Sequence, residues 1–266
     1  MNEGRLVPLT PGTAGAEEIT VYAKGFLTRG EEPDHFDAWL DSHREAAQRN
    51  EWAPGAVGYR WPSGEVGLPP IPFASALKLA WDAWGALSKA RRANIPATIA
   101  LTAGEEIARV AIRFASEYRA AERAAHERAE HFAETLSDLR RKHARVRVVA
   151  HSLGCRHAIE AIDLLPSVER PDAVHLCAPA CREDVVGERL AALAKERTVL
   201  YYTPDDLVLR TGFALMSGGT ALGSAPPQSV YAGLEVLDVS QHFQFWTHSE
   251  YKRQFGRFAR GDGSAG

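Results

Sequence analysis

The stretch that decides the fold is Val148-Val149-Ala150-His151-Ser152-Leu153-Gly154. An apolar β-type run breaks here into Ser152 and Gly154 and then opens a helix. This order is typical of a nucleophile elbow, G-x-S-x-G, with Ala150 in place of the first glycine. Small residues flank the serine because the backbone must turn tightly beside neighbouring strands. The alternative is that Ser152 only caps the helix, as serine often does at strand-to-helix junctions.

Strands and helices alternate on both sides of this stretch. A helix is predicted over Phe36–Gln48, with Phe36, Leu40 and Ala47 on one face. Strands are predicted at Glu18–Ala23, Ala56–Trp61, Val146–Ala150, Ala173–Cys177, Thr198–Tyr202 and Val230–Val239. The alternation predicts a mainly parallel sheet flanked by helices, and together with the elbow it indicates an α/β-hydrolase fold.

The domain organisation follows from length and from a long helical region. At 266 residues the chain is expected to form a single domain over 1–266, with 1–16 and 260–266 disordered. Residues 68–144 are predicted to form a helical insertion between the early strands and the nucleophile strand, with helices at Phe73–Ala90 and Ala97–Lys142. The insertion either packs on the core or serves as a lid, a dimer interface or, through 73–92, a membrane-surface contact.

Composition excludes several classes of protein. The chain is 45% hydrophobic and 24% charged, with a formal net charge of -3, so no basic surface for nucleic acid is expected. No signal peptide and no membrane-spanning run is recognisable. The three cysteines are an odd number and indicate free thiols and a cytoplasmic location. Their spacing matches no zinc site, and neither a metal nor a cofactor is expected.

An acid and a base follow the elbow in the order that α/β-hydrolases use. Asp205 and Asp206 come directly after the strand Thr198–Tyr202, and His242 and His248 follow the last strand. Either carboxylate and either imidazole could serve. Each also has an ordinary structural explanation, since aspartate is common in turns and histidine among aromatic residues is often packed.

An oxyanion hole needs two backbone N–H groups directed at one point. One belongs to the residue after the nucleophile, here Leu153. The other comes from an early strand-to-helix loop, for which Phe26 is the candidate because Gly25 allows the backbone to turn its N–H groups inward.

Several further short motifs lie along the chain. They are Gly58-Tyr59-Arg60-Trp61-Pro62-Ser63, Ala103-Gly104 with Ile107-Ala108, Ala150 to Arg156, Cys177-Ala178-Pro179, Asp206 to Leu209 and Asp238-Val239-Ser240. Through these motifs the sequence resembles a family of α/β-hydrolases of unknown function that includes the transmembrane-and-coiled-coil protein type. The resemblance implies Ser152, Asp206 and His248 as the triad, because tyrosine follows the family's histidine by three positions, as Tyr251 does here. The elbow departs from the family pattern, with Ala150 and His151 in place of glycine and an aromatic residue.

The expected activity is that of a serine hydrolase acting on a small-molecule or lipid ester through an acyl-enzyme. Thioester cleavage or acyl transfer would use the same residues. A catalytically silent fold used for binding or as a scaffold is the alternative from another class. The sequence does not indicate the substrate or the oligomeric state.

Overall fold

The computed structural model describes residues 4–26, 36–50, 52–63, 116–243 and 247–261. Within them lies a seven-stranded sheet of order β1-β3-β2-β4-β5-β6-β7. Only β1 runs antiparallel to its neighbour, and the other pairs are parallel. The strands are β1 (Arg5–Pro8), β2 (Glu18–Ala23), β3 (Ala56–Arg60), β4 (Arg145–His151), β5 (Ala173–Cys177), β6 (Arg197–Tyr202) and β7 (Leu234–Asp238). The predicted mainly parallel sheet is confirmed.

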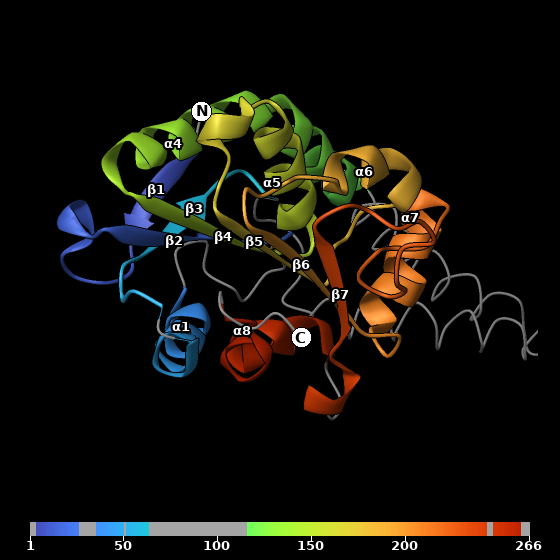
Figure 1. Cartoon of the computed structure of the whole chain (residues 1–266). Coiled ribbons are helices and arrows are strands. Elements are labelled where there is room, and N and C mark those ends of the chain that lie inside the picture. Colours follow the sequence, from blue (N-terminus) through green and yellow to red (C-terminus); the bar gives the residue numbers. More distant parts are fainter. Residues whose placement is uncertain (1–3, 27–35, 51, 64–115, 244–246, 262–266) are drawn as a thin grey trace, which may run out of the picture.

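Helices cover both faces of this sheet, as Figure 1 shows. On one face lie α1 (Asp37–Asn50) and α8 (Thr247–Phe258). On the other lie α4 (Ala129–Lys142), α5 (Leu153–Asp163) and α6 (Glu183–Leu190). Shorter helical segments are η1 (Thr13–Gly15), η2 (Ser167–Glu169), the π-helix η3 (Val208–Phe213), α7 (Ala214–Ser217) and η4 (Ser240–His242).

The terminal segments are more ordered than the sequence predicts. The disorder expected for 1–16 is wrong at Arg5–Pro8, which pairs with β3. A four-residue segment that ends in proline carries no local sign of a partner strand, and its pairing within the described sheet is with the edge of β3. At the other end, the Arg260 N–H donates to the Tyr201 hydroxyl at 3.0 Å. The last residues, 262–266, lie outside the described part.

The predicted helical insertion is described only at its end. Residues 116–127 are helical, a turn follows at Arg128, and α4 continues to Lys142. The predicted helix Ala97–Lys142 is therefore interrupted once in this part. The helix predicted at Phe73–Ala90 and the segment 73–92 lie outside the described residues.

The buried face of α1 differs from the predicted one. Trp39, Ser42, His43 and Ala46 are buried, whereas Leu40 is only partly so. A pattern of apolar residues does not predict this face, because two of its buried side chains, Ser42 and His43, are polar. His43 tolerates burial because the Tyr22 hydroxyl donates to its Nδ1 at 2.9 Å and its Nε2–H donates to the Pro54 carbonyl at 3.3 Å.

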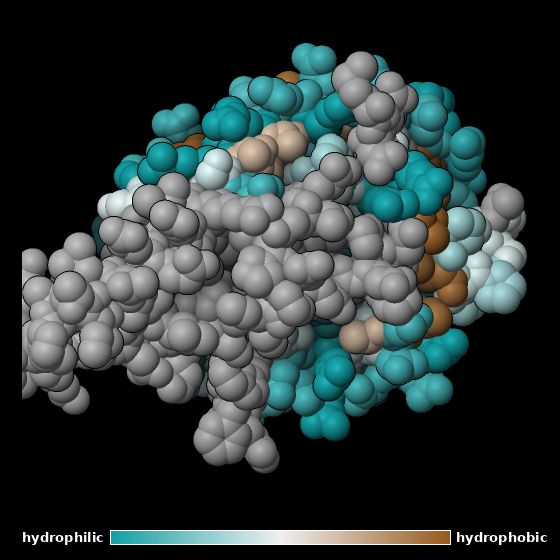
Figure 2. Space-filling model, turned by 180° about the vertical axis from the view of Figure 1, so that it is seen from behind, coloured by the Kyte–Doolittle hydropathy of each residue, from teal (hydrophilic) through white to brown (hydrophobic). Residues whose placement is uncertain are grey.

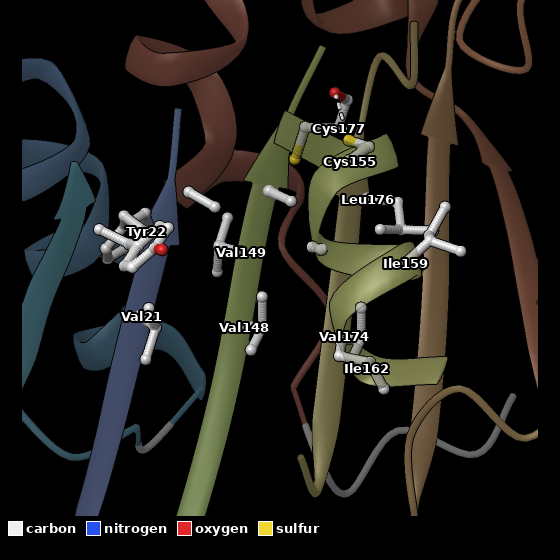
Figure 3. Packing of buried hydrophobic residues seen from close by; sticks show 14 of the residues in the cluster. Val21, Tyr22, Val148, Val149, Cys155, Ile159, Ile162, Val174, Leu176 and Cys177 are labelled. Carbon is white, nitrogen blue, oxygen red and sulfur yellow. Dashed lines mark hydrogen bonds between the residues drawn. The ribbon is translucent and has the colours of Figure 1, made fainter. Parts of the chain in front are cut away.

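Apolar side chains from the sheet and α5 form the core on the opposite face. Ile159 and Ile162 of α5 share one buried cluster with Val174 and Leu176 of β5 (Figure 3). Cys155, Cys177 and Cys181 are free and buried. This packing fixes α5, and with it the turn between β4 and α5, relative to the sheet.

The carboxyl ends of β2 and β4 lie side by side where the strand order changes direction. Chain connections leave β2 toward β3 on one side, and β4 pairs with β2 on the other, with Ala23 opposite Ala150. In open α/β sheets, ligands bind outside the carboxyl ends of the strands at such a point. The elbow therefore stands at the position where a site is expected.

The described surface carries few large apolar side chains. The exposed ones are Leu164, Val168, Val185, Leu207 and Val230. In the view of Figure 2 the described surface is mainly hydrophilic, with apolar residues in small areas. Among the described helices, none is long and apolar enough to cross a bilayer.

Buried histidines predict a loss of stability in mild acid. Burial lowers the pKa of both His43 and His157 to about 4. The contribution of these two rings to the free energy of unfolding is fully present above the pKa of an unfolded histidine, about 6.5. It is lost as the pH falls toward 4, and the free energy of unfolding then falls by up to about 1.4 kcal/mol per pH unit for each ring. The measurement is the free energy of unfolding by urea at pH 7, 6 and 5.

A variant isolates one of these contributions. Asparagine at position 157 can still donate to the Ala125 carbonyl, which the His157 Nδ1–H reaches at 2.7 Å, but it does not titrate. We expect His157→Asn to reduce the pH dependence of the free energy of unfolding by the amount that one histidine contributes. An unchanged pH dependence would contradict the assignment.

Gly154 predicts an unusual response to alanine. A Cβ at this position would lie 2.4 Å from the Lys24 carbonyl oxygen and 2.7 Å from that of Ala23. Alanine normally stabilises a helix relative to glycine, but here it would push α5 away from β2, so we expect Gly154→Ala to destabilise by about 1–3 kcal/mol. Gly15, whose Cβ would meet nothing within 4 Å, is the control. Equal stability of Gly154→Ala and wild type in thermal unfolding would contradict the close approach.

Candidate active site

Ser152 occupies a sharp turn between β4 and α5. Its φ of 55° and ψ of -125° form a conformation that non-glycine residues rarely adopt. Three backbone hydrogen bonds hold it. The Ser152 N–H donates to the Cys177 carbonyl at 2.9 Å, and the Ser152 carbonyl accepts from Cys155 and Ala180 at 3.1 Å each. The elbow is therefore anchored to the end of β5 and to the loop after it.

The loop after β2 packs directly against this serine. A Cβ on Gly25 would lie 2.6 Å from the Ser152 Cβ and 2.9 Å from the His151 carbonyl oxygen, so only glycine fits. Phe26, the next residue, is partly buried and its ring lies 5.6 Å from that of Tyr118. Leu153 is fully buried and begins α5, where a backbone N–H has no acceptor within the helix. The residues predicted for an oxyanion hole thus flank Ser152 on two sides.

His248, near the start of α8, connects Ser152 to Asp206. Its Nε2 lies 3.0 Å from the Ser152 Oγ, and its Nδ1 lies 2.7 Å from the Asp206 Oδ2. A carboxylate only accepts, so Nδ1 carries the proton and Nε2 is left to accept from the serine hydroxyl. The three side chains form one continuous hydrogen-bonded chain.

Asp206 is held by a second contact. Its Oδ1 accepts from the Leu209 N–H at 3.1 Å, and the side chain is fully buried. Ser152 is 5% exposed, and the His248 side chain is 16% exposed. The Asp206 carboxylate is thus shielded from water, whereas the His248 ring remains partly exposed.

The alternative acid and base lie elsewhere. The Asp205 side chain is exposed, and it is the backbone of this residue that makes contacts nearby: its carbonyl accepts from the Thr247 hydroxyl at 3.2 Å. His242 sits in η4, with its ring 5.4 Å from that of Phe258. Partial burial, then Arg49 and Arg257, lower the pKa of His242. The structure brings Ser152, Asp206 and His248 together and leaves Asp205 and His242 outside this chain.

A hydroxyl network holds the loop that carries Asp206. The Ser240 hydroxyl donates to Asp238, so the Thr203 hydroxyl, 2.9 Å away, must donate to Ser240. Thr203 also accepts the Asp205 N–H at 3.2 Å, and its carbonyl accepts the Asp206 N–H at 3.2 Å. The loop after β6 is thereby tied to the end of β7.

Tyr251 helps to set the orientation of α8 and of its residue His248. It follows His248 by three residues and is fully buried, with its ring 6.0 Å from His151 and 4.7 Å from Phe243. Residues three apart lie on one face of a helix, so burying Tyr251 turns His248 toward the sheet. Phe245 and Trp246 lie outside the described residues.

Sequence reasoning missed the supporting residues. His151 and Ser240 lie within the quoted motifs and Thr203 directly follows a predicted strand, but nothing in their spacing assigns them a partner. The sequence offers one sign of such a residue: His151, a polar side chain, stands directly before the candidate nucleophile.

The described residues contain no group of three His, Cys, Asp or Glu side chains placed to hold a metal ion. Burial raises the pKa of Cys155, Cys177 and Cys181, which keeps these thiols protonated.

Comparison with known proteins places these residues in a family. The model of a family described as "Alpha/beta hydrolase of unknown function (DUF900)" matches residues 95–250, which is more than half of the chain and includes Ser152, Asp206 and His248. No curated protein matches the chain. The resemblance inferred from sequence is thus supported at the level of the family, and the α/β-hydrolase fold is confirmed. The chain belongs to the DUF900 family of alpha/beta hydrolases of unknown function.

Proposed function

We propose that the protein is a serine hydrolase that cleaves carboxylic esters, with Ser152 as nucleophile, His248 as general base and Asp206 as the acid that orients it. The observation that carries the proposal is the continuous chain from the Ser152 Oγ through His248 to Asp206, with contacts of 3.0 and 2.7 Å. Nucleophile, base and orienting group within hydrogen-bond reach are the signature of an activated serine.

The chemistry proceeds in two halves. In the first, the Ser152 hydroxyl proton passes to the His248 Nε2 while Oγ bonds to the ester carbonyl carbon. The tetrahedral species collapses, the bond to the alcohol oxygen breaks, and His248 returns the proton to the departing alcohol. In the second half, His248 takes a proton from water, whose oxygen attacks the acyl carbon. The carboxylic acid product leaves, and Ser152 regains its proton from His248.

The negative oxygen of each tetrahedral species needs two N–H donors. We assign the backbone N–H groups of Leu153 and Phe26 to this role, because Leu153 follows the nucleophile and Gly25 brings the loop of Phe26 against Ser152. The N-terminal end of α5 adds a favourable partial positive charge.

A lipid or acyl ester is the substrate class we favour. The support is the aromatic and basic sequence of 73–92, which suits a lipid boundary. The closer relation to the transmembrane-and-coiled-coil type rests on motifs such as His248-x-x-Tyr251 and forms part of the same proposal. Thioester hydrolysis and acyl transfer use the same residues and differ in the bond attacked or the acceptor.

The proposal is tested with a fluorophosphonate probe and a panel of chromogenic esters of graded acyl length. Wild type should be labelled at Ser152 and hydrolyse part of the panel. Ser152→Ala should do neither, since it lacks the nucleophile. Ser229→Ala, at an exposed serine, is the matched control and should behave as wild type.

The outcomes separate the alternatives. Labelling of Ser152 without ester hydrolysis would support the activated serine but not the ester substrate. The reaction would then be thioester hydrolysis or acyl transfer. Absence of both in folded wild type would overturn the enzyme and indicate a catalytically silent fold.

The tandem aspartates give a second prediction. Asparagine at 206 would place an amide N–H₂ against the His248 Nδ1, which forces the proton onto Nε2 and prevents it from accepting from Ser152. We expect Asp206→Asn to lower kcat by about 10³–10⁴-fold, by analogy with serine proteases. Asp205→Asn, at an exposed side chain, should change kcat by no more than about twofold. Steady-state kinetics with the best ester decides, and the reverse ranking would move the acid to Asp205.

A further inference from the structure

His151, the residue before Ser152, contacts the backbone of the residue whose ring faces that serine. Its Nε2 lies 2.9 Å from the His248 carbonyl oxygen. A carbonyl only accepts, so the His151 Nε2 carries a proton and donates it. Two consecutive residues of the elbow therefore contact one residue of α8, with Ser152 meeting its ring and His151 its carbonyl.

The surroundings of His151 favour a neutral ring. It is 4% exposed and lies against the rings of Trp39 from α1 and of His248 and Tyr251 from α8, at 6.0, 4.9 and 6.0 Å. Burial, followed by the nearby His248 and Lys252, holds the pKa of His151 well below its usual value. A neutral ring with its proton on Nε2 donates to the carbonyl without adding positive charge beside His248.

The contact has a mechanical consequence. His248 is the second residue of α8, so its position relative to the sheet depends on what holds the first turn. Thr247 contacts the loop of Asp205, and Tyr251 is buried one turn later. The His151 hydrogen bond joins the backbone of this turn to the end of β4, the strand that leads into Ser152. An imidazole buried among aromatic rings costs more than a phenyl ring unless its N–H groups find acceptors, and this contact supplies one.

We propose that His151 is a positioning residue, whose Nε2–H holds the His248 carbonyl and so sets the approach of the His248 ring to Ser152. The proposal rests on the roles proposed above for Ser152 and His248. It assigns a function to the histidine that departs from the elbow pattern.

The test compares side chains with and without the donor. His151→Phe keeps the ring packing and removes the N–H, whereas His151→Gln keeps a donor near the position of Nε2. His151→Met is a second donor-free variant, close to glutamine in shape, in case the phenylalanine variant does not fold. The matched control is His157→Phe, which removes another buried histidine that donates to a backbone carbonyl, at Ala125 on the other face of the sheet.

Two readouts are measured on the full chain. Ester hydrolysis should show kcat lowered about tenfold in the donor-free variants with KM within about twofold, the size expected when one hydrogen bond that holds a reacting group is lost. Glutamine should restore most of kcat, and His157→Phe should leave it unchanged. Amide hydrogen exchange over 248–252 should be faster in the donor-free variants, normal in His151→Gln and unaffected by His157→Phe.

Either of two results would overturn the proposal. One is normal kcat and normal exchange in a donor-free variant. The other is a folded His151→Gln that is as impaired as the phenylalanine or methionine variant, which would assign the role to ring shape. If wild type hydrolyses no ester and takes no fluorophosphonate label, the proposed function fails, and hydrogen exchange still decides whether His151 holds the start of α8.

Discussion

The backbone of Ser152 is the constraint on which the rest of the site depends. A positive φ at a serine costs on the order of 1–3 kcal/mol, and the turn persists only because the surroundings over-determine it. Hydrogen bonds to Cys177, Cys155 and Ala180 fix the turn. Helix α5, which follows the turn, cannot shift without breaking the apolar packing between its buried side chains and the sheet. The hydroxyl is thereby held at the edge of the sheet and is not free to act as an ordinary helix cap.

The sheet brings the partners to this point from distant parts of the sequence. Parallel strands end at one edge, so the loop of Gly25 after β2 and the loop of Asp206 after β6 open on the same side as the elbow. The histidine is different, because it comes from the first turn of α8 and not from a strand end. Its position is set by packing on the opposite face of the sheet, through Tyr251, and by contacts to the loop of Asp205.

The sequence predicts what is local or periodic and misses what depends on a partner. Strand β2 and strand β5 begin and end as predicted, because buried parallel strands are continuous β-type runs between breakers. Strand β1 escapes prediction since its order comes from β3. Order along the chain leaves two histidines as candidates for the general base. It cannot choose between them, because the choice depends on how η4 and α8 pack around the elbow. The hydrogen bonds between His151 and His248 and between Thr203 and Ser240 join residues far apart in sequence, which a motif does not reveal.

The central claim is that the His248 ring activates Ser152. The most direct test is the rate at which a fluorophosphonate labels Ser152, followed by mass spectrometry, in folded wild type, His248→Ala and His242→Ala. The account predicts that His242→Ala is labelled at close to the wild-type rate and that His248→Ala is slowed by about 10²–10⁴-fold, the usual contribution of a general base. Labelling of His248→Ala at the wild-type rate, or selective loss of labelling in His242→Ala, would contradict it.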